Sequence, residues 1–197
     1  MAPIDDALSA PGNRRFTPPG HYPRSLLPNA GVDFAYIKAT EGGDYVDATF
    51  GTNWAGAKAV GIERGAYHFY SLCRPGAEQA ANFIRVVPRA PDALPPAIDL
   101  EYLGNCDKPV SVAAFHRELG AFIRPIERRY RQPVVLYLTG EFDRTYHVSA
   151  RVDRPLWLRS ILTEPGFGAR PWALWQASSF RRLPGIAGRV DWNVARP

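Results

Sequence analysis

The chain has 197 residues, a formal net charge of +5 at pH 7 and a sequence pI near 9.4. Its 46% hydrophobic and 22% charged residues are typical of one folded globular domain, which excludes a largely disordered chain. No apolar run approaches the length of a membrane span, and two distant cysteines are too few for a zinc site.

The excess of positive charge favours an anionic partner, either a nucleic acid or an acidic polymer such as a bacterial cell wall. The basic residues occur in scattered pairs, at Arg14–Arg15, Arg128–Arg129 and Arg181–Arg182, and none of these forms the dense run of a nucleic-acid-binding arm. We therefore expect no nucleic-acid partner. A solvated basic surface explains each pair taken alone.

Residues 1–29 contain three proline clusters, little periodicity and no convincing strand, so we expect a segment that can be poorly ordered. The first residues, Met1–Asp6, lack the basic start and apolar core of a signal peptide. Residues 30–197 are expected to form a single domain.

From residue 31 onward, short apolar runs alternate with segments of helical periodicity. Aromatic and β-branched residues mark the predicted strands, and apolar residues three and four apart mark the predicted helices. The first elements are a strand at 32–38, a helix at 49–60 that Gly61 ends, a strand at 65–70 and a helix at 75–87.

The next apolar run, Pro95–Glu101, ends in two carboxylates, Asp99 and Glu101. In a strand, successive side chains alternate faces, so both acids point to one face and Leu100 points to the other. Acids crowded on one face repel, which raises one pKa while the other stays low; a glycoside hydrolase uses this arrangement for a proton donor beside an ionised partner. The alternative is a pair of solvated acids at a strand end.

A helix is predicted over 111–130, with Ser111 as its N-cap and Pro125 expected to kink or divide it. The remaining strands are predicted at 133–138, 156–158, 172–176 and 190–192, with no room for full helices between the last three. Strand–helix alternation favours a parallel sheet with right-handed crossovers. The number of strands in one small domain favours closure into a barrel, whose catalytic groups lie at the C-terminal strand ends.

Seven blocks, in matching order and spacing over roughly residues 30–194, resemble glycoside hydrolase family 25, the Chalaropsis-type lysozymes. They are AGVDFAYIKATEG (30–42), GAYHF (65–69), LPPAIDLE (94–101), LYLT (136–139), PLWL (155–158), WQ (175–176) and GIAGRVDWN (185–193). The first three blocks together are specific, and the last four are useful only as a series. The resemblance implies an irregular TIM-like (β/α) barrel of the α/β class, with about eight strands and roughly five helices.

The same resemblance implies a peptidoglycan muramidase that hydrolyses the bond between N-acetylmuramic acid and N-acetylglucosamine. By the matching motifs, Glu101 is the acid/base. Asp99 orients or stabilises the substrate's N-acetyl group, which attacks in place of an enzyme nucleophile with retention, and Asp191 is a further active-site carboxylate. No metal or cofactor is implied. The expected partner is bacterial peptidoglycan, the expected location is periplasmic or extracellular, and the barrel is expected to stand as a monomer.

The N-terminal segment departs from the family pattern. The family begins with a strand of the form Gly-Ile-Asp-Val-Ser, whose Asp lines the site, and nothing before Ala30 matches it at the expected distance. Arg14–Phe16 falls roughly there, and the Pro3–Asp6 run is a faint echo too far upstream. Three explanations are open for the missing strand: the start is truncated, it is altered by a frameshift, or it has diverged. The alternative function is therefore a catalytically impaired glycan-binding protein of the same fold.

Further substrate contacts are expected from aromatic and amide side chains. Strand alternation places Tyr67 and Phe69 on one face and His68 on the other, so we assign Tyr67 and Phe69 to the lumen and allow His68 to be a core residue. A phenol or indole offers a stacking face, although a tryptophan is more often a core residue. The substrate-binding candidates are Tyr67, Phe69, Tyr137, Trp175 and Gln176.

Two smaller pairings are also expected. Lys38 and Glu41 are predicted to form a structural ion pair near the rim. Cys73 follows the strand at 65–70 and Cys106 follows the strand with the acids, so neighbouring strands bring both thiols to one rim and a disulfide is geometrically reasonable. Free buried thiols are the alternative, and a disulfide would indicate an oxidising compartment.

Overall fold

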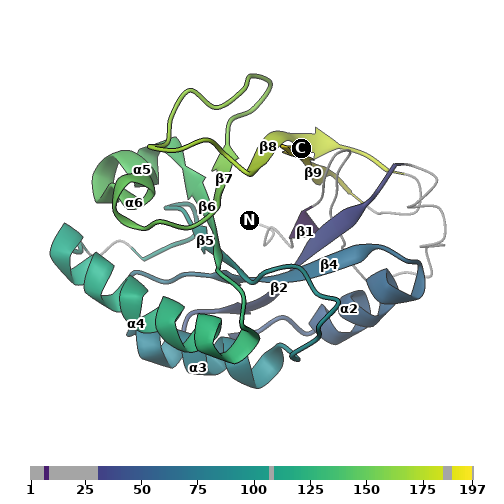
Figure 1. The fold of residues 1–197 in the computed structure, drawn as a ribbon, viewed down its shortest axis with the longest axis horizontal. Coiled ribbons are helices and arrows are strands. Elements are labelled where there is room, and N and C mark those ends of the chain that lie inside the picture. Colours follow the sequence, from purple (N-terminus) through teal and green to yellow (C-terminus); the bar gives the residue numbers. More distant parts are fainter. Residues whose placement is uncertain (1–6, 9–30, 107–108, 184–187, 197) are drawn as a thin grey trace.

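Nine strands form one curled sheet in a computed structural model, which describes residues 7–8, 31–106, 109–183 and 188–196. The strands follow the order β1-β2-β4-β5-β6-β7-β8-β9, and β3 pairs with β2 outside this path (Figure 1). Their bounds are β1 Ala7–Leu8, β2 Phe34–Glu41, β3 Tyr45–Val46, β4 Glu63–Phe69, β5 Ala97–Leu100, β6 Val135–Thr139, β7 Leu156–Arg159, β8 Leu174–Arg181 and β9 Val190–Ala195.

Along the path β2-β4-β5-β6-β7-β8 neighbouring strands are parallel, which confirms the strand–helix alternation predicted from the sequence, and the short β3 pairs with β2 in antiparallel fashion. The helices in the described residues are α2 Phe50–Ala59, α3 Gly76–Val86, α4 Val112–Tyr130, α5 Gly140–Tyr146 and α6 Val148–Arg151. The sheet curls into a half-barrel, with β1 and β9 at the two ends of the hydrogen-bonded path. The predicted irregular TIM-like α/β fold is therefore confirmed.

The end strands differ from the expected parallel pattern, because β1 pairs with β2 and β9 pairs with β8 in antiparallel fashion. The segment between β8 and β9 is too short for the crossover that a parallel partner needs. The prediction of a poorly ordered segment at 1–29 concerns residues outside the described part of the chain, except for the two residues of β1.

Local signals set most helix boundaries as expected. The Ser111 hydroxyl caps α4 by accepting the Ala114 N–H at 3.2 Å. Gly61 follows α2 with a φ of +75°, the left-handed conformation typical of a residue just beyond a helix. Of the two outcomes expected at Pro125, division does not occur, since α4 is continuous through it.

Helices α5 and α6 were missed in the sequence, because segments of seven and four residues are too short to display a helical period. The Thr139 hydroxyl caps α5 by accepting the Phe142 N–H at 3.4 Å. Among the described residues, no helix is both long and apolar enough to span a lipid bilayer.

Helices α3 and α4 lie side by side across the outer face of the sheet (Figure 1). Gly76 makes their close approach sterically feasible, because a Cβ atom there would lie 1.8 Å from the Glu118 carbonyl oxygen. The Glu118 carboxylate also accepts the Gly76 N–H at 3.1 Å. The first turn of α3 is thus fixed against the middle of α4.

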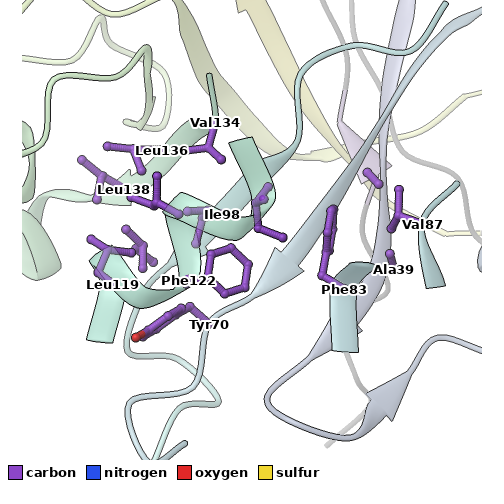
Figure 2. Packing of buried hydrophobic residues seen from close by; sticks show 14 of the residues in the cluster. Ala39, Tyr70, Phe83, Val87, Ile98, Leu119, Phe122, Val134, Leu136 and Leu138 are labelled. Atoms are coloured by element: carbon purple, nitrogen blue, oxygen red, sulfur yellow. The ribbon is translucent and has the colours of Figure 1, made fainter. Parts of the chain in front are cut away.

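The period-2 alternation of the strands divides the core into two clusters. The outer cluster fills the space between sheet and helices (Figure 2), where Ile98, Leu136 and Leu138 contact the layer formed by Phe83, Leu119 and Phe122. The inner cluster lies on the concave side of the sheet and is mainly aromatic. Its members are Phe34, Tyr36, Tyr67, Ala97, Val135, Tyr137, Trp157 and Leu174.

Candidate active site

The two candidate acids lie where β5 ends. Ala97 belongs to the inner cluster while Ile98 and Leu100 belong to the outer cluster, so alternation places Asp99 on the concave side. Glu101 follows directly after β5 and interacts electrostatically with Asp191 of β9 and Lys38 of β2. Both acids therefore face the interior of the curl at the C-terminal strand ends.

Burial is the largest influence on both carboxyl groups. It raises the pKa of Asp99 well above its ordinary value, and the negative charges of Glu101, Asp191 and Glu41 raise it further. Burial also raises the pKa of Glu101 to about 7, with a further contribution from Asp191. The Oδ1 atom of Asp99 is shielded from solvent and has no hydrogen-bond partner among the described residues.

Two cations oppose these effects. Lys38 lowers the pKa of both Asp99 and Glu101, and the exposed Arg159 at the end of β7 lowers the pKa of Glu101. Lys38 is held at the site by Glu41, which accepts its hydrogen bond at 2.9 Å, and by the rings of Tyr45 and Phe69 at 5.5 and 5.3 Å. The expected Lys38–Glu41 pair is confirmed, and Lys38 also tunes the acids.

A line of neutral hydrogen bonds joins the strands beside the acids. The Tyr137 hydroxyl donates to Gln176 Oε1 at 2.7 Å, and the Trp157 indole donates to Asn193 Oδ1 at 2.9 Å. Gln176 and Asn193 face each other across β8 and β9. Burial, followed by the charge of Glu101, raises the pKa of Tyr137 and keeps its phenol neutral.

Asp191 is the third carboxylate of the site, buried on β9 two residues before Asn193. Its negative charge raises the pKa of Asp99, Glu101 and Tyr137, which come from two other strands and their ends. The structure thus brings together the three acids that were singled out in the sequence.

An aromatic floor supports this polar layer. The Trp157 ring lies 5.2 Å from Tyr36 and 5.1 Å from Tyr137. Tyr36 occupies space that a side chain at residue 65 would need, because a Cβ on Gly65 would lie 2.3 Å from the Tyr36 ring. Gly65 therefore allows the floor to close beneath the acids.

On β4, the structure places Tyr67 and Phe69 on the inner side and His68 on the helix side. Tyr67 belongs to the inner cluster, and Phe69 pairs with Asp99. His68 is fully buried, 2.7 Å from the Thr40 hydroxyl and 3.0 Å from Gln79 Oε1. Burial lowers the pKa of His68 to about 4, which matches a neutral core histidine.

Trp175 does not reach the candidate site, contrary to the sequence-based expectation. It lies between Leu174 and Gln176, which are both buried on the inner face, and it pairs with Leu158 of the outer cluster. Its indole N–H donates to the Ser160 carbonyl at 2.6 Å, on the outer side. Alternation allows only one of Trp175 and Gln176 to face the acids.

The loop after Glu101 is fixed to the loop after β4. Cys73 and Cys106 form a disulfide with Cα atoms 6.0 Å apart. The Asn105 amide donates to the carbonyls of Tyr70 and Glu101 at 2.7 and 3.0 Å, and its Oδ1 accepts the Leu72 N–H at 2.8 Å. This network ties the Glu101 carbonyl to the loop after β4.

Sequence reasoning missed Arg159 and Asn193 as members of the site. Arg159 follows Trp157 at an interval of two on one strand, and Asn193 follows Asp191 in the same way. The period-2 rule was thus the signal that could have found both.

The family's first-strand Asp is expected in a region that lies outside the described residues. Among the residues that the structure describes, no group of three or more His, Cys, Asp or Glu is arranged to hold a metal ion.

Comparisons with known proteins agree with this geometry. A family model described as glycosyl hydrolases family 25 matches residues 23–186. Lysozyme M1 of Streptomyces globisporus is 33% identical over an alignment of 187 residues, and the match covers 86% of this chain and 62% of that protein. The chain spans 59% to 62% of the length of the first curated relatives that it matches.

Solved structures give the same result. A family 25 glycosyl hydrolase from Bacillus anthracis superimposes with a TM-score of 0.82 and 37% identity, covering 90% of this chain and 84% of that one. A bacterial lysozyme from Streptomyces coelicolor superimposes with a TM-score of 0.81 and 30% identity, covering 90% of this chain and 88% of that one.

Proposed function

Because the chain belongs to glycosyl hydrolase family 25, we propose that it is a peptidoglycan muramidase that hydrolyses the bond between N-acetylmuramic acid and N-acetylglucosamine. The observation that carries the proposal is the convergence of Asp99, Glu101 and Asp191 on the concave side of the sheet. Sugar hydrolysis needs a carboxylic acid that is still protonated at working pH beside a second carboxyl group.

Glu101 is the proton donor in this proposal. A pKa of about 7 leaves a large fraction of this carboxyl protonated near neutral pH, so it can protonate the glycosidic oxygen. After the leaving group departs, the same carboxylate accepts a proton from the attacking water. Arg159 at the rim then stabilises the anionic form of Glu101, whose pKa it lowers.

Asp99 acts on the substrate's N-acetyl group. Its buried Oδ1 atom lacks a hydrogen-bond partner among the described residues, and an amide N–H supplies the missing donor. That hydrogen bond favours ionised Asp99, which orients the acetamido carbonyl for attack on the anomeric carbon with retention. Lys38 aids the ionised state, because its charge lowers the pKa of Asp99.

The neighbouring polar residues hold the sugar. Tyr137 and Gln176 are hydrogen-bonded to each other, and together with Phe69 they border Asp99 and Glu101 across the sheet. Asp191 keeps the pKa of Glu101 raised, which favours its acid form. We assign Tyr67 to the support of this layer, since it is buried in the inner cluster.

The proposed place of action is periplasmic or extracellular. The Cys73–Cys106 disulfide supports it, since disulfides persist in oxidising compartments. Peptidoglycan is the proposed partner. The proposed working form is a monomer, because all three acids belong to one chain.

The test is hydrolysis of purified peptidoglycan, with the new reducing ends identified after borohydride reduction. The purified protein is expected to produce reducing N-acetylmuramic acid, and Glu101→Gln is expected to lower the rate by at least about a hundredfold while retaining the native circular dichroism. Glu141→Gln is the matched control, because Glu141 is an exposed acid on α5, outside the proposed site. Proton NMR of the first product is expected to detect the β-anomer, as retention requires.

Three results would contradict the proposal in different ways. Reducing N-acetylglucosamine would identify a different bond, and full activity of Glu101→Gln would remove this residue from its role. Tight sedimentation with cell walls without any new reducing ends would favour the alternative of a catalytically impaired glycan-binding protein.

A further inference from the structure

A second concave site lies on the outer surface, where the last turns of α3 and α4 meet the segment that leads to β5. It is a pocket of about 420 Å³. Its lining is four arginines and two apolar residues: Ile84, Arg89, Pro125, Arg128, Arg129 and Arg131.

Among the described residues, no acid lines this pocket, and the acids closest in sequence have other partners. Glu127 binds Arg154 and accepts the Val134 N–H, and Asp92 binds Lys58 and Arg64. Among the described residues, none of the four pocket arginines has an ion-pair partner; Arg129 alone has a ring contact, 5.9 Å from Tyr130. The positive charge of the pocket is therefore not neutralised within the described part of the chain.

Helix capping explains only part of this cluster. Cations near a helix C-terminus are favourable, which accounts for Arg128 and Arg129 in the last turn of α4. Arg89 belongs to the connection between α3 and β5, outside the last turn of either helix. Arg131 adopts the left-handed conformation with a φ of +62° just after α4, and it lines the pocket beside Arg128.

We propose that this pocket binds the phosphate groups of a phosphodiester-linked polyanion of the cell wall. All four cations are arginines, whose planar fork matches phosphate oxygens in a way that a lysine ammonium does not. A phosphate on a flexible polymer can enter a concave pocket, whereas the phosphates of a flat bilayer surface fit such a shape less well. The six lining residues include no aromatic ring, so the pocket lacks the stacking platform of a single-strand nucleic-acid site.

The pocket lies at the opposite end of the barrel from the acids. Helix α4 leaves the C-terminal end of β5 and leads to the N-terminal end of β6, so its last turn lies at the N-terminal edge of the sheet. Glu101 lies at the C-terminal edge. A bound polymer therefore holds the protein on the wall without covering the hydrolytic site. The choice of a wall polymer rests on the proposed muramidase function.

The test measures binding of poly(glycerol phosphate), which contains no muramic acid, by fluorescence anisotropy at low salt. The pocket variant is Arg89→Gln/Arg128→Gln, and the control is Arg144→Gln/Arg151→Gln, two exposed arginines on α5 and α6 with the same loss of charge. The pocket variant is expected to bind at least about fivefold more weakly, as two exposed ion pairs allow, while the control stays within about twofold of the original protein. Both variants are expected to hydrolyse a short soluble peptidoglycan fragment at the original rate.

Specific outcomes overturn this proposal. Equal weakening in both double variants indicates a diffuse charge effect, and undiminished binding by the pocket variant removes the pocket from recognition. Stronger binding to phosphatidylglycerol vesicles, to polygalacturonate or to an oligonucleotide than to poly(glycerol phosphate) identifies another ligand class. Failure of the muramidase proposal can be told apart from failure of this one. If the protein is no muramidase, peptidoglycan yields no new reducing ends, but binding of poly(glycerol phosphate) can still be measured.

Discussion

The pH dependence of hydrolysis tests the assignment of Glu101 as the proton donor most directly. If the protonated carboxyl is required and its pKa is about 7, kcat/KM falls as pH rises through neutrality. The protonated fraction drops from about 91% at pH 6 to about 9% at pH 8, so the rate is expected to fall about tenfold. With an unperturbed glutamate, this alkaline limb of the pH profile would have its midpoint below pH 5.

Removal of Arg159 supplies the perturbation. Its charge lowers the pKa of Glu101, so Arg159→Gln is expected to raise that pKa and move the alkaline limb to higher pH. Arg159 is exposed and its influence is screened by water, so the interaction is worth about 0.5 kcal/mol and the limb moves by roughly 0.4 pH unit.

The assay is kcat/KM for a soluble peptidoglycan fragment between pH 4 and pH 10, since this ratio reports the ionisation of the free protein. Arg144→Gln is the control for an exposed arginine outside the site. A flat profile from pH 6 to pH 9 would refute the assignment of Glu101 as the acid. A shift of the limb to lower pH in Arg159→Gln would refute the electrostatic reasoning.

Two further predictions concern the support of the site. Gly65→Ala is expected to lower the free energy of unfolding by about 1–3 kcal/mol in urea titrations, because its Cβ would lie 2.3 Å from the Tyr36 ring. Gly51→Ala, in open space on α2, is expected to be neutral or stabilising, and an equal loss in both variants would contradict the steric argument. His68 has a pKa of about 4 in the folded protein against 6.5 when unfolded, so the unfolded state binds the extra proton and stability falls as pH drops through this range. Because of His68, the free energy of unfolding is expected to fall by about 2 kcal/mol between pH 7 and pH 5. If stability depends on pH just as strongly in His68→Phe, His68 is not the source.

Most of the fold was predictable because strand and helix signals alternate regularly over residues 31–138. Ser111 and Gly61 marked their helix ends correctly, since capping is local chemistry. The antiparallel β9 and the short helices α5 and α6 were not predictable in this way. Strand direction depends on the connection and the position in the sheet, and neither is visible in the apolar pattern of a single strand.

The site was predictable where one strand contains the signal. Alternation along β5 is sufficient to orient Asp99. Trp175 was assigned to the wrong face because nothing in the sequence of its strand shows which face is inward. The inward face becomes evident from Gln176 and Asn193 only once the pairing of β8 with β9 is known. Alternation from Trp157 could have placed Arg159 on the inner face, but which acid its charge reaches depends on how strands distant in sequence are paired.

The two clusters of the core have different consequences for function. The outer cluster stabilises the contact of sheet and helices, and its side chains are remote from the acids. The inner cluster excludes water beneath Asp99 and Glu101, and burial is the largest cause of the raised pKa of each. The aromatic floor of Tyr36, Tyr137 and Trp157 is therefore part of the acid chemistry as well as of the fold. Cavities opened in this floor admit water and lower the pKa of Glu101, whereas equal cavities in the outer cluster reduce stability and leave the pH profile unchanged.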